Sequence, residues 1–315
     1  MPADPLQCFF RGQYMPFSEA KVGVMTHALN YGTGVFEGIR AYWNDDEEQI
    51  YLLKMREHYE RLHRSCRVMR IELPHSVDEL CEITHELLRR NGYREDVYVR
   101  PLAFKDQEMI GVRLHDVSDA FAIYTAPMGA YIEVERGIRV AVSSWRRMDD
   151  NMIPPRAKVT GLYVNSALAK TEAIENGFDE AIMLTQAGLV SEGSAENIFL
   201  LIDGTLVTPA PSEHILMGIT RAAVMELASD ELGLETVERQ VGRSELYGAD
   251  EVMLVGTGAQ ISPVVEIDRR PIGTGDIGPV TAQLQRIYFG AVRGENPKYA
   301  SWCRAVYPGR APTAT

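Results

Sequence analysis

One of the six lysines in the chain, Lys158, lies in a segment that suits an amine for covalent chemistry. It follows the pair Pro154–Pro155, which prevents a regular helix, and precedes Gly161, which permits close backbone approach to a ligand. A lysine in a partly desolvated site, or beside another cation, offers the neutral amine that forms a Schiff base with a carbonyl. Most lysines are solvated surface charges. Lys158 is therefore a candidate Schiff-base lysine, and the assignment requires further side chains that could bind a cofactor.

Two side chains downstream of Lys158 could tune an aromatic cofactor held by that lysine. Tyr163 offers a phenol to a ring oxygen, and Glu192 offers a carboxylate that would keep a pyridine nitrogen protonated and the ring electron-withdrawing. The alternative for the stretch 188–197 around Glu192 is a hairpin turn with exposed acids, and that stretch alone favours the alternative.

A phosphate site is suggested where Gly218 and Thr220 open an amphipathic helix, with Thr220 as the N-cap. Backbone N–H groups and the positive end of a helix bind phosphate without overall basic charge. Arg61 could add a bidentate clamp, although arginines on an amphipathic helix are usually solvated. Gly256–Thr257–Gly258, after an apolar strand, could add a hydroxyl and amides, the alternative being a tight turn.

Other chemistries lose support from the sequence. No G-x-x-x-x-G-K-[ST], H-E-x-x-H or G-x-S-x-G motif is present. Gly32-Thr-Gly34 is only part of a dinucleotide fingerprint, because Glu37 stands where the third glycine should be, and a turn is the better interpretation. His58 and His63, five residues apart on an expected helix, do not align on one face for a metal. We expect no metal site.

Bulk properties limit the partners. The formal charge of −12 disfavours nucleic acid and anionic lipid. No signal peptide and no stretch of eighteen apolar residues is present, so we expect a cytoplasmic protein. Four scattered cysteines lack C-x-x-C spacing and are expected to be plain reduced thiols.

Length and pattern predict two domains, because 315 residues exceed the usual size of a single core. The expected boundaries are 1–124 for a small α+β domain, 125–135 for a loop and 136–315 for a larger α/β domain. In the first domain the patterns predict helices at about 54–70 and 77–91 and strands at 50–53 and 97–102. In the second they predict strands at 138–143, 181–184, 197–202 and 251–255 and helices at about 163–176 and 220–232, the latter ended by Gly233.

Taken in order, these motifs resemble the fold-type IV pyridoxal-phosphate enzymes, and most closely the branched-chain amino acid aminotransferases. The similarity runs nearly end to end and includes these stretches: Asn30-Tyr-Gly-Thr-Gly-Val-Phe-Glu-Gly-Ile-Arg40, Arg61-Leu-His63, Tyr98-Val-Arg-Pro-Leu102, Lys158-x-x-Gly-x-Tyr163, Ser191-Glu-Gly193, Glu196-Asn197, Gly218-Ile-Thr-Arg221 and Gly256-Thr257. The resemblance implies a fold-type IV α/β architecture and transamination between branched-chain L-amino acids and 2-oxoglutarate.

The resemblance also implies a role for each site residue. Lys158 would form the Schiff base with pyridoxal 5′-phosphate and then shuttle the proton between the substrate α-carbon and the cofactor. The other cofactor residues would be Tyr163 at the ring oxygen, Glu192 at the pyridine nitrogen, Leu216 on one ring face, and Arg61, Gly218, Ile219, Thr220 and Thr257 around the phosphate.

The substrate residues implied by the resemblance are Tyr31, Phe36, Gly38, Arg40, Tyr98, Arg100, Met128, Tyr131 and Gly258. Their aromatic members favour an apolar side chain. Glutamate must also be accepted, so a cation is needed for its second carboxylate, with Arg100 the first candidate and Arg40 the next. The resemblance further implies a homodimer or larger homo-oligomer, in which the loop at about 105–115 approaches the neighbouring subunit's site.

The chain departs from the family pattern at Met128, where many relatives carry Trp, and at Arg156 and Leu162, where smaller or polar residues are common. These departures leave the chemistry intact and bear on specificity. D-amino acid or (R)-amine transaminases and aminodeoxychorismate lyase share the fold and stay open as alternatives. A non-catalytic protein, in which Lys158 is a surface charge, is the alternative outside the enzymes.

Overall fold

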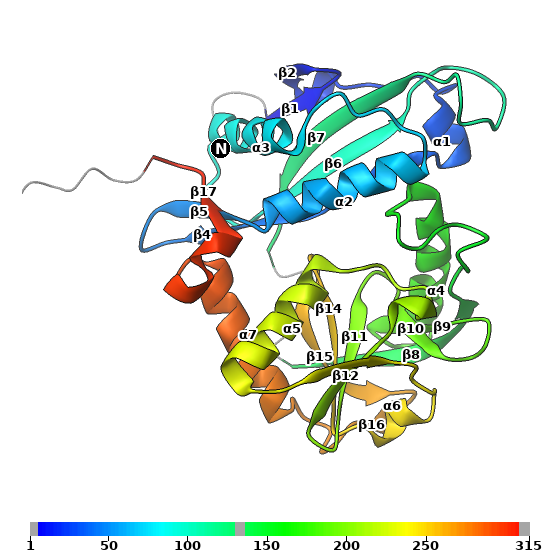
Figure 1. The fold of residues 1–315 in the computed structure, drawn as a ribbon, viewed down its shortest axis with the longest axis vertical. Helices are drawn as coiled ribbons and strands as arrows, with labels where there is room; N and C mark the ends of the chain where they lie inside the picture. The colour runs from blue at the N-terminus through cyan, green and yellow to red at the C-terminus, as the bar shows by residue number, and fades with distance from the viewer. Residues whose placement is uncertain (1–5, 130–135, 309–315) are drawn as a thin grey trace, which may run out of the picture. The chain divides into compact units, whose positions relative to one another are not determined.

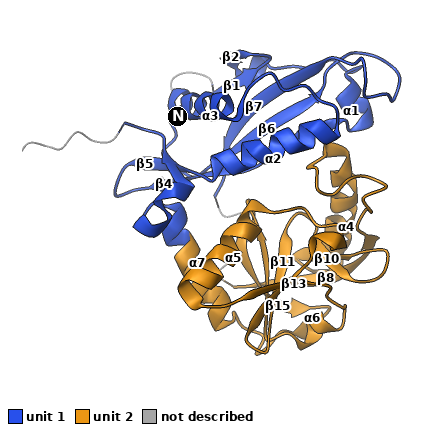
Figure 2. Ribbon diagram, viewed as in Figure 1, with its two compact units in different colours: residues 1–129, 289–315 blue, residues 130–288 orange. Residues whose placement is uncertain are grey.

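The computed structural model describes residues 6–129 and 136–308. The chain forms two compact units (Figure 2): residues 1–129 with 289–315, and residues 130–288. The predicted second domain, 136–315, differs from this division at its end. The strand β17 (Cys303–Ala305) pairs with β5 (Gln49–Leu53), so the end of the chain adds an edge strand to the first unit.

The first unit is built on an eight-stranded antiparallel sheet. Its order is β17-β5-β4-β6-β7-β1-β2, with β3 paired to β6 (Figure 1). The remaining strands are β1 (Gln7–Phe10), β2 (Gln13–Pro16), β3 (Gly34–Phe36), β4 (Ile39–Asn44), β6 (Val97–Lys105) and β7 (Asp119–Pro127). The predicted loop at 125–135 begins inside β7, and residues 130–135 lie outside the described part of the chain.

Three helices accompany this sheet: α1 (His27–Tyr31), α2 (Met55–Val68) and α3 (Val77–Asn91). The predicted helix at 77–91 is confirmed to the residue, because Ser76 and Glu79 form a capping box at its start and Gly92 takes a left-handed conformation at its end. Buried side chains of α2, including Tyr59 and Leu62, pack it onto the unit's core.

The second unit is built on a nine-stranded mixed sheet, ordered β10-β9-β8-β15-β14-β11-β12-β13 with β16 paired to β15. Its strands are β8 (Ile138–Arg146), β9 (Glu180–Leu184), β10 (Val190–Gly193), β11 (Asn197–Ile202), β12 (Thr205–Pro209), β13 (Thr236–Arg239), β14 (Glu251–Gly256), β15 (Gln260–Ile267) and β16 (Arg270–Pro271). The core contains Val140, Ile198 and Leu254, none of them exposed.

Two helices of this unit are crossovers between parallel strands (Figure 1). The helix α4 (Tyr163–Glu175) connects β8 to its parallel neighbour β9, and α5 (Ile219–Leu232) connects β12 to its parallel neighbour β13. Parallel strands require such crossovers, and ligands commonly bind beyond the carboxyl ends of the strands they follow. Both crossovers begin at predicted site residues, Tyr163 and Ile219.

The remaining helices are α6 (Glu245–Gly248), α7 (Pro279–Val292) and four short 3-10 segments at Phe17–Glu19, Thr160–Leu162, Pro211–Glu213 and Pro297–Trp302. Among the described residues no helix has the length and apolarity needed to cross a membrane. The mixed second sheet with its crossovers and the antiparallel first sheet confirm the predicted α/β and α+β character of the two parts.

Candidate active site

Lys158 and Tyr163 lie together in the second unit. Lys158 Nζ donates to Tyr163 Oη at 2.6 Å, and both side chains are half-buried. Lys158 lies two residues before the 3-10 turn that leads into α4, and Tyr163 is the first residue of α4. The turn brings these two residues, five positions apart in the sequence, into contact.

Glu192 lies on β10 and is buried against a second charge. Its Oε1 is 2.5 Å from Arg147 Nη2, and each side chain is only 5% exposed. Its other oxygen, Oε2, accepts hydrogen bonds from Asn197 Nδ2 at 2.9 Å and from the Leu216 amide at 3.0 Å. Buried charges persist when they are paired and hydrogen-bonded in this way. Glu192 is therefore fixed in place, and the alternative of an exposed hairpin acid is wrong.

Asn197 connects Glu192 to the start of α5. Its Nδ2 also donates to the Leu216 carbonyl at 2.9 Å, and it pairs with Val255 across β11 and β14. A Cβ at Gly218 would overlap Asn197 Oδ1, so only glycine fits there. The backbone at 216–218 is thereby held beside the carboxylate, at the amino end of α5.

The start of α5 differs from the prediction in one respect. Gly218 is the N-cap, the helix begins at Ile219, and Thr220 is its second residue, so Thr220 is not the cap that the sequence suggested. The first amides of α5 point out of the helix end, as in any α-helix. Thr257 and Gly258 lie in the turn between β14 and β15, two residues past Val255, and both are half-buried.

The remaining cofactor candidate, Arg61, lies on α2 in the first unit. Its side chain is 6% exposed rather than solvated. Arg61 Nε and Nη2 donate to the two oxygens of Glu37 at 2.7 and 2.8 Å, the forked geometry of a guanidinium with a carboxylate.

Four of the predicted substrate residues share one face of the first sheet. Arg40 pairs with Tyr98 between β4 and β6, and Phe36 pairs with Leu102, two residues beyond Arg100. The Arg100 guanidinium lies 4.4 Å from the centre of the Phe36 ring, and its Nη2 donates to Tyr98 Oη at 2.7 Å. A Cβ at Gly38 would overlap the same Tyr98 hydroxyl. The result is an aromatic surface with one guanidinium stacked on it.

The two candidate arginines of that surface have different surroundings. Arg40 is 1% exposed, donates to the Gly129 carbonyl at 3.1 Å and lies 3.6 Å from an oxygen of Asp96. Arg100 is half-buried between Phe36 and Tyr98. The Asp96 contact is longer than a hydrogen bond, and Arg40 Nε and Nη2 have no hydrogen-bond partner among the described residues. Both arginines therefore stay candidates for the second carboxylate.

The other predicted substrate residues are placed as follows. Tyr31 ends α1, is 36% exposed, and accepts a hydrogen bond from the Gly111 amide at 3.1 Å. Met128 is half-buried just after β7, its amide donating to the Asp96 carbonyl. Tyr131 lies outside the described residues.

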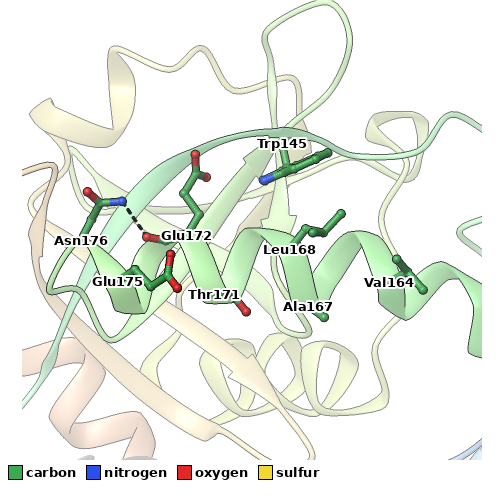
Figure 3. Close-up of a pocket in the computed structure, with 8 residues that line it drawn as sticks. All are labelled: Trp145, Val164, Ala167, Leu168, Thr171, Glu172, Glu175 and Asn176. Carbon is green, nitrogen blue, oxygen red and sulfur yellow. Dashed lines mark hydrogen bonds between the residues drawn. The ribbon is translucent and has the colours of Figure 1, made fainter.

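A groove of about 460 Å³ runs along α4 and contains none of the predicted site residues (Figure 3). Trp145, Val164 and Leu168 line it, with Glu172 and Asn176 at one end. Burial by itself would raise the pKa of Glu172, but hydrogen bonds from Ser143 and Ser144 outweigh it and lower that pKa. The groove offers no nucleophile and no cation. Across the described chain no cluster of His, Cys, Asp and Glu could hold a metal ion.

The sequence analysis missed two charged residues that contact site side chains. Glu37 was treated only as a break in a glycine motif, and Arg147 was not considered. Each is the buried partner of a predicted site residue, Arg61 and Glu192 respectively. Glu37 was within the stretch 30–40 used for the resemblance, so the signal for it was present.

Residues 34–267 match the family model described as "Amino-transferase class IV". The chain belongs to the class IV aminotransferases. A probable branched-chain-amino-acid aminotransferase of Aquifex aeolicus is 54% identical over 299 residues, which cover 95% of this chain and 96% of that protein.

Solved structures of branched-chain aminotransferases are also similar to this class IV aminotransferase. The Thermoproteus uzoniensis enzyme, solved with norvaline, has a TM-score of 0.92 at 43% identity and covers 96% of this chain and 100% of its own. The enzyme of T.th., solved with N-(5′-phosphopyridoxyl)-L-glutamate, has a TM-score of 0.90 at 41% identity, covering 96% and 99%. The predicted family and fold type are confirmed.

Proposed function

We propose that this enzyme uses pyridoxal 5′-phosphate to transfer amino groups between branched-chain L-amino acids and 2-oxoglutarate. The observation that carries the proposal is the 2.6 Å hydrogen bond between Lys158 Nζ and Tyr163 Oη in a class IV aminotransferase. Similar enzymes that bear the branched-chain name, one of them solved with a phosphopyridoxyl-glutamate, support the substrate and cofactor classes.

The second unit carries the donor and acceptor types that the cofactor's polar groups require. Glu192 supplies a fixed carboxylate for the pyridine nitrogen, and Tyr163 supplies a phenol for the ring oxygen. Gly218 is forced to be glycine by Asn197, which keeps the amino end of α5 open to a phosphate. The bound cofactor supplies an electron-withdrawing ring that eases loss of the α-proton and carries the amino group between half-reactions.

The protein's own groups then have distinct tasks. Lys158 would hold the cofactor, and its amine would move the proton to and from the substrate α-carbon. Tyr163 orients that amine through their hydrogen bond. In the second unit, Leu216 would lie against the cofactor ring and Ile219, Thr220 and Thr257 would bind its phosphate. In the first unit, Arg61 is the residue that the resemblance assigns to the phosphate.

Substrate selection is assigned to the aromatic face of the first unit. Phe36 and Tyr98 would receive the branched aliphatic side chain. The resemblance adds Tyr31, Gly38 and Met128 of the first unit, together with Tyr131 and Gly258. Arg100 would receive the second carboxylate of glutamate, because its guanidinium lies on the Phe36 and Tyr98 rings, and Arg40 is the next candidate.

We also propose a homo-oligomer. Apolar side chains are exposed together in the first unit, where an isolated bridge joins Thr26 to Glu108 and the Met109 amide donates to the Met25 carbonyl. Val24 is 83% exposed and Ile110 is 86% exposed. Such a patch is typical of an interface.

The proposed compartment is the cytoplasm, in keeping with four cysteines that form no disulfide.

An absorption spectrum of the purified enzyme tests the proposed reaction. We expect a band at the violet edge of the visible that is lost with L-leucine and restored by 2-oxoglutarate. An absorption band that does not change with L-leucine but is lost with (R)-1-phenylethylamine or a D-amino acid would contradict the substrate assignment. Pyruvate release from aminodeoxychorismate would indicate the lyase, and no band after addition of cofactor would refute the role of Lys158.

A further inference from the structure

Arg61 belongs to a buried group of three charged or polar residues in the first unit. Glu37 is 0% exposed, His58 2% and Arg61 5%. Glu37 lies between β3 and β4, and its amide donates to the Pro101 carbonyl at 2.9 Å, which anchors the residue to β6. His58 and Arg61 are three residues apart on α2, so both face the same side of the helix and reach the same carboxylate.

The contacts of Glu37 fix the guanidinium plane of Arg61. Glu37 Oε1 accepts from Arg61 Nε at 2.7 Å, and Oε2 accepts from Arg61 Nη2 at 2.8 Å and from His58 Nδ1 at 2.7 Å. Two parallel bonds to one edge of a planar guanidinium remove its rotational freedom. The opposite edge, which carries Nη1, is then directed away from Glu37 at a set angle.

The charge of Glu37 is set by the same contacts. Burial by itself would raise its pKa, but the Arg61 charge and the hydrogen bonds from Arg61 and His58 outweigh burial and hold that pKa well below its usual range. The lowered pKa favours the anionic form of Glu37, and an anion accepts the forked pair more strongly than a neutral acid would.

We propose that Glu37 and His58 are positioning residues that fix the orientation in which Arg61 binds the cofactor's phosphate. This inference rests on the proposed function, in which Arg61 is a phosphate ligand. It goes further by assigning the phosphate selectivity of Arg61 to a carboxylate and an imidazole that are not among the residues assigned to the cofactor or the substrate. The carboxylate fixes the guanidinium plane, and His58 fixes the carboxylate.

The proposal predicts a defect that depends on the phosphate group. The full-length protein, freed of cofactor, is titrated with pyridoxal 5′-phosphate and separately with pyridoxal, which lacks the phosphate. Glu37→Gln should raise the dissociation constant for pyridoxal 5′-phosphate by about 10- to 100-fold, the scale of one lost charged hydrogen bond. The constant for pyridoxal should change by less than about threefold, within the spread of one neutral contact. His58→Asn should show the same selective effect at about 2- to 10-fold, the scale of one neutral hydrogen bond.

A buried ion pair elsewhere in the same unit provides the control. Lys105 Nζ lies 2.9 Å from Asp119 Oδ1, and Asp119→Asn removes that pair without touching the Arg61 group. We expect this variant to melt earlier while keeping the ratio of the two dissociation constants unchanged. In an Arg61→Met background, Glu37→Gln should add nothing to the change in that ratio.

Each outcome has one meaning. Equal losses for pyridoxal 5′-phosphate and pyridoxal, or no loss for either, would overturn the positioning role. If Glu37→Gln does not fold, His58→Asn decides by the same ratio. Wild-type protein that binds neither compound would instead refute the proposed function and the inference with it. Wild-type binding of both compounds with equal strength would refute the phosphate site, Arg61 included, and with it this inference, but would leave the proposed role of Lys158 intact.

Discussion

Each unit contains a carboxylate buried against a guanidinium, but the member of the pair that is assigned to the ligand differs between the two units. In the second unit Arg147 holds Glu192, and the carboxylate is the group assigned to the ligand. In the first unit Glu37 holds Arg61, and the guanidinium is the group assigned to the ligand. A buried ion pair is weak evidence for stability, and we interpret each of these two pairs as one charge holding the other in a fixed orientation. The function of such a pair follows from which member faces the ligand.

The largest expected effect lies outside both pairs and tests the reaction they are proposed to support. Lys158→Ala should lower kcat on the order of 10⁴-fold or more, the scale seen when a covalent catalytic group is removed. The fold should survive, because the side chain is half-buried and contributes little core volume. Steady-state kinetics and circular dichroism measure the two effects. Lys21→Ala, at an exposed site, is the control, and full activity in Lys158→Ala would refute the mechanism.

The second prediction separates the members of the Glu192 pair. Glu192→Gln should lower kcat by about 10²- to 10³-fold, because the cofactor ring loses the anion that keeps its nitrogen protonated. Arg147→Met should lower kcat less while lowering the free energy of unfolding by about 3–5 kcal/mol, since it leaves a buried charge unpaired. Kinetics and denaturant unfolding check both. A larger kcat loss for Arg147→Met than for Glu192→Gln would reverse the roles assigned to this pair.

Much of the scaffold around these pairs was predictable from local patterns. The helix at 77–91 has a capping box and a terminal glycine, and the strand at 197–202 is a short apolar run; both predictions are confirmed to the residue. The helix predicted at 163–176 and the one predicted at 220–232 are confirmed to within one residue at each end. Such signals are contained within the segments themselves.

The errors and omissions share a different cause, since each depends on residues distant in sequence. At Gly218, the N-cap of α5, the space for a side chain is taken by Asn197, 21 positions earlier. The pairing of Arg147 with Glu192 spans 45 positions, and β17 joins β5 from the far end of the chain. Glu37 belonged to the stretch used for the resemblance, but its burial against Arg61, 24 positions away, does not show in that stretch. Local pattern therefore predicts elements better than it predicts which charges meet.

A third prediction extends the comparison to the arginines of the aromatic face. Arg100→Met should raise KM for 2-oxoglutarate by about 10- to 100-fold, the cost of one charge-assisted contact, and leave KM for L-leucine nearly unchanged. Arg40→Met should instead lower the melting temperature, because it removes the buried partner of Asp96. Kinetics with each substrate and thermal unfolding decide between them. Selective loss of 2-oxoglutarate binding in Arg40→Met would instead assign the second carboxylate of the substrate to Arg40.

The smallest expected effect concerns Glu196, a buried carboxylate of the second unit for which the described residues provide no ion pair. Burial, followed by the charge of Glu180, raises the pKa of Glu196 from its ordinary 4.5 to about 8. The folded state thus holds a proton that the unfolded chain releases. Between pH 4.5 and 8 the contribution of Glu196 to the free energy of unfolding falls as pH rises, because this group binds more protons in the folded state than in the unfolded state.

Glu196→Gln keeps a carbonyl oxygen for the Ala195 amide, which donates to Glu196 Oε2 at 3.0 Å, and removes the titration. We expect the variant to match the wild type at pH 4 and to exceed its free energy of unfolding by roughly 1–3 kcal/mol at pH 9. Denaturant unfolding across this range measures the difference. A constant difference at all pH values would mean that Glu196 does not titrate there, and would remove the contrast between a buried acid with a guanidinium and one without.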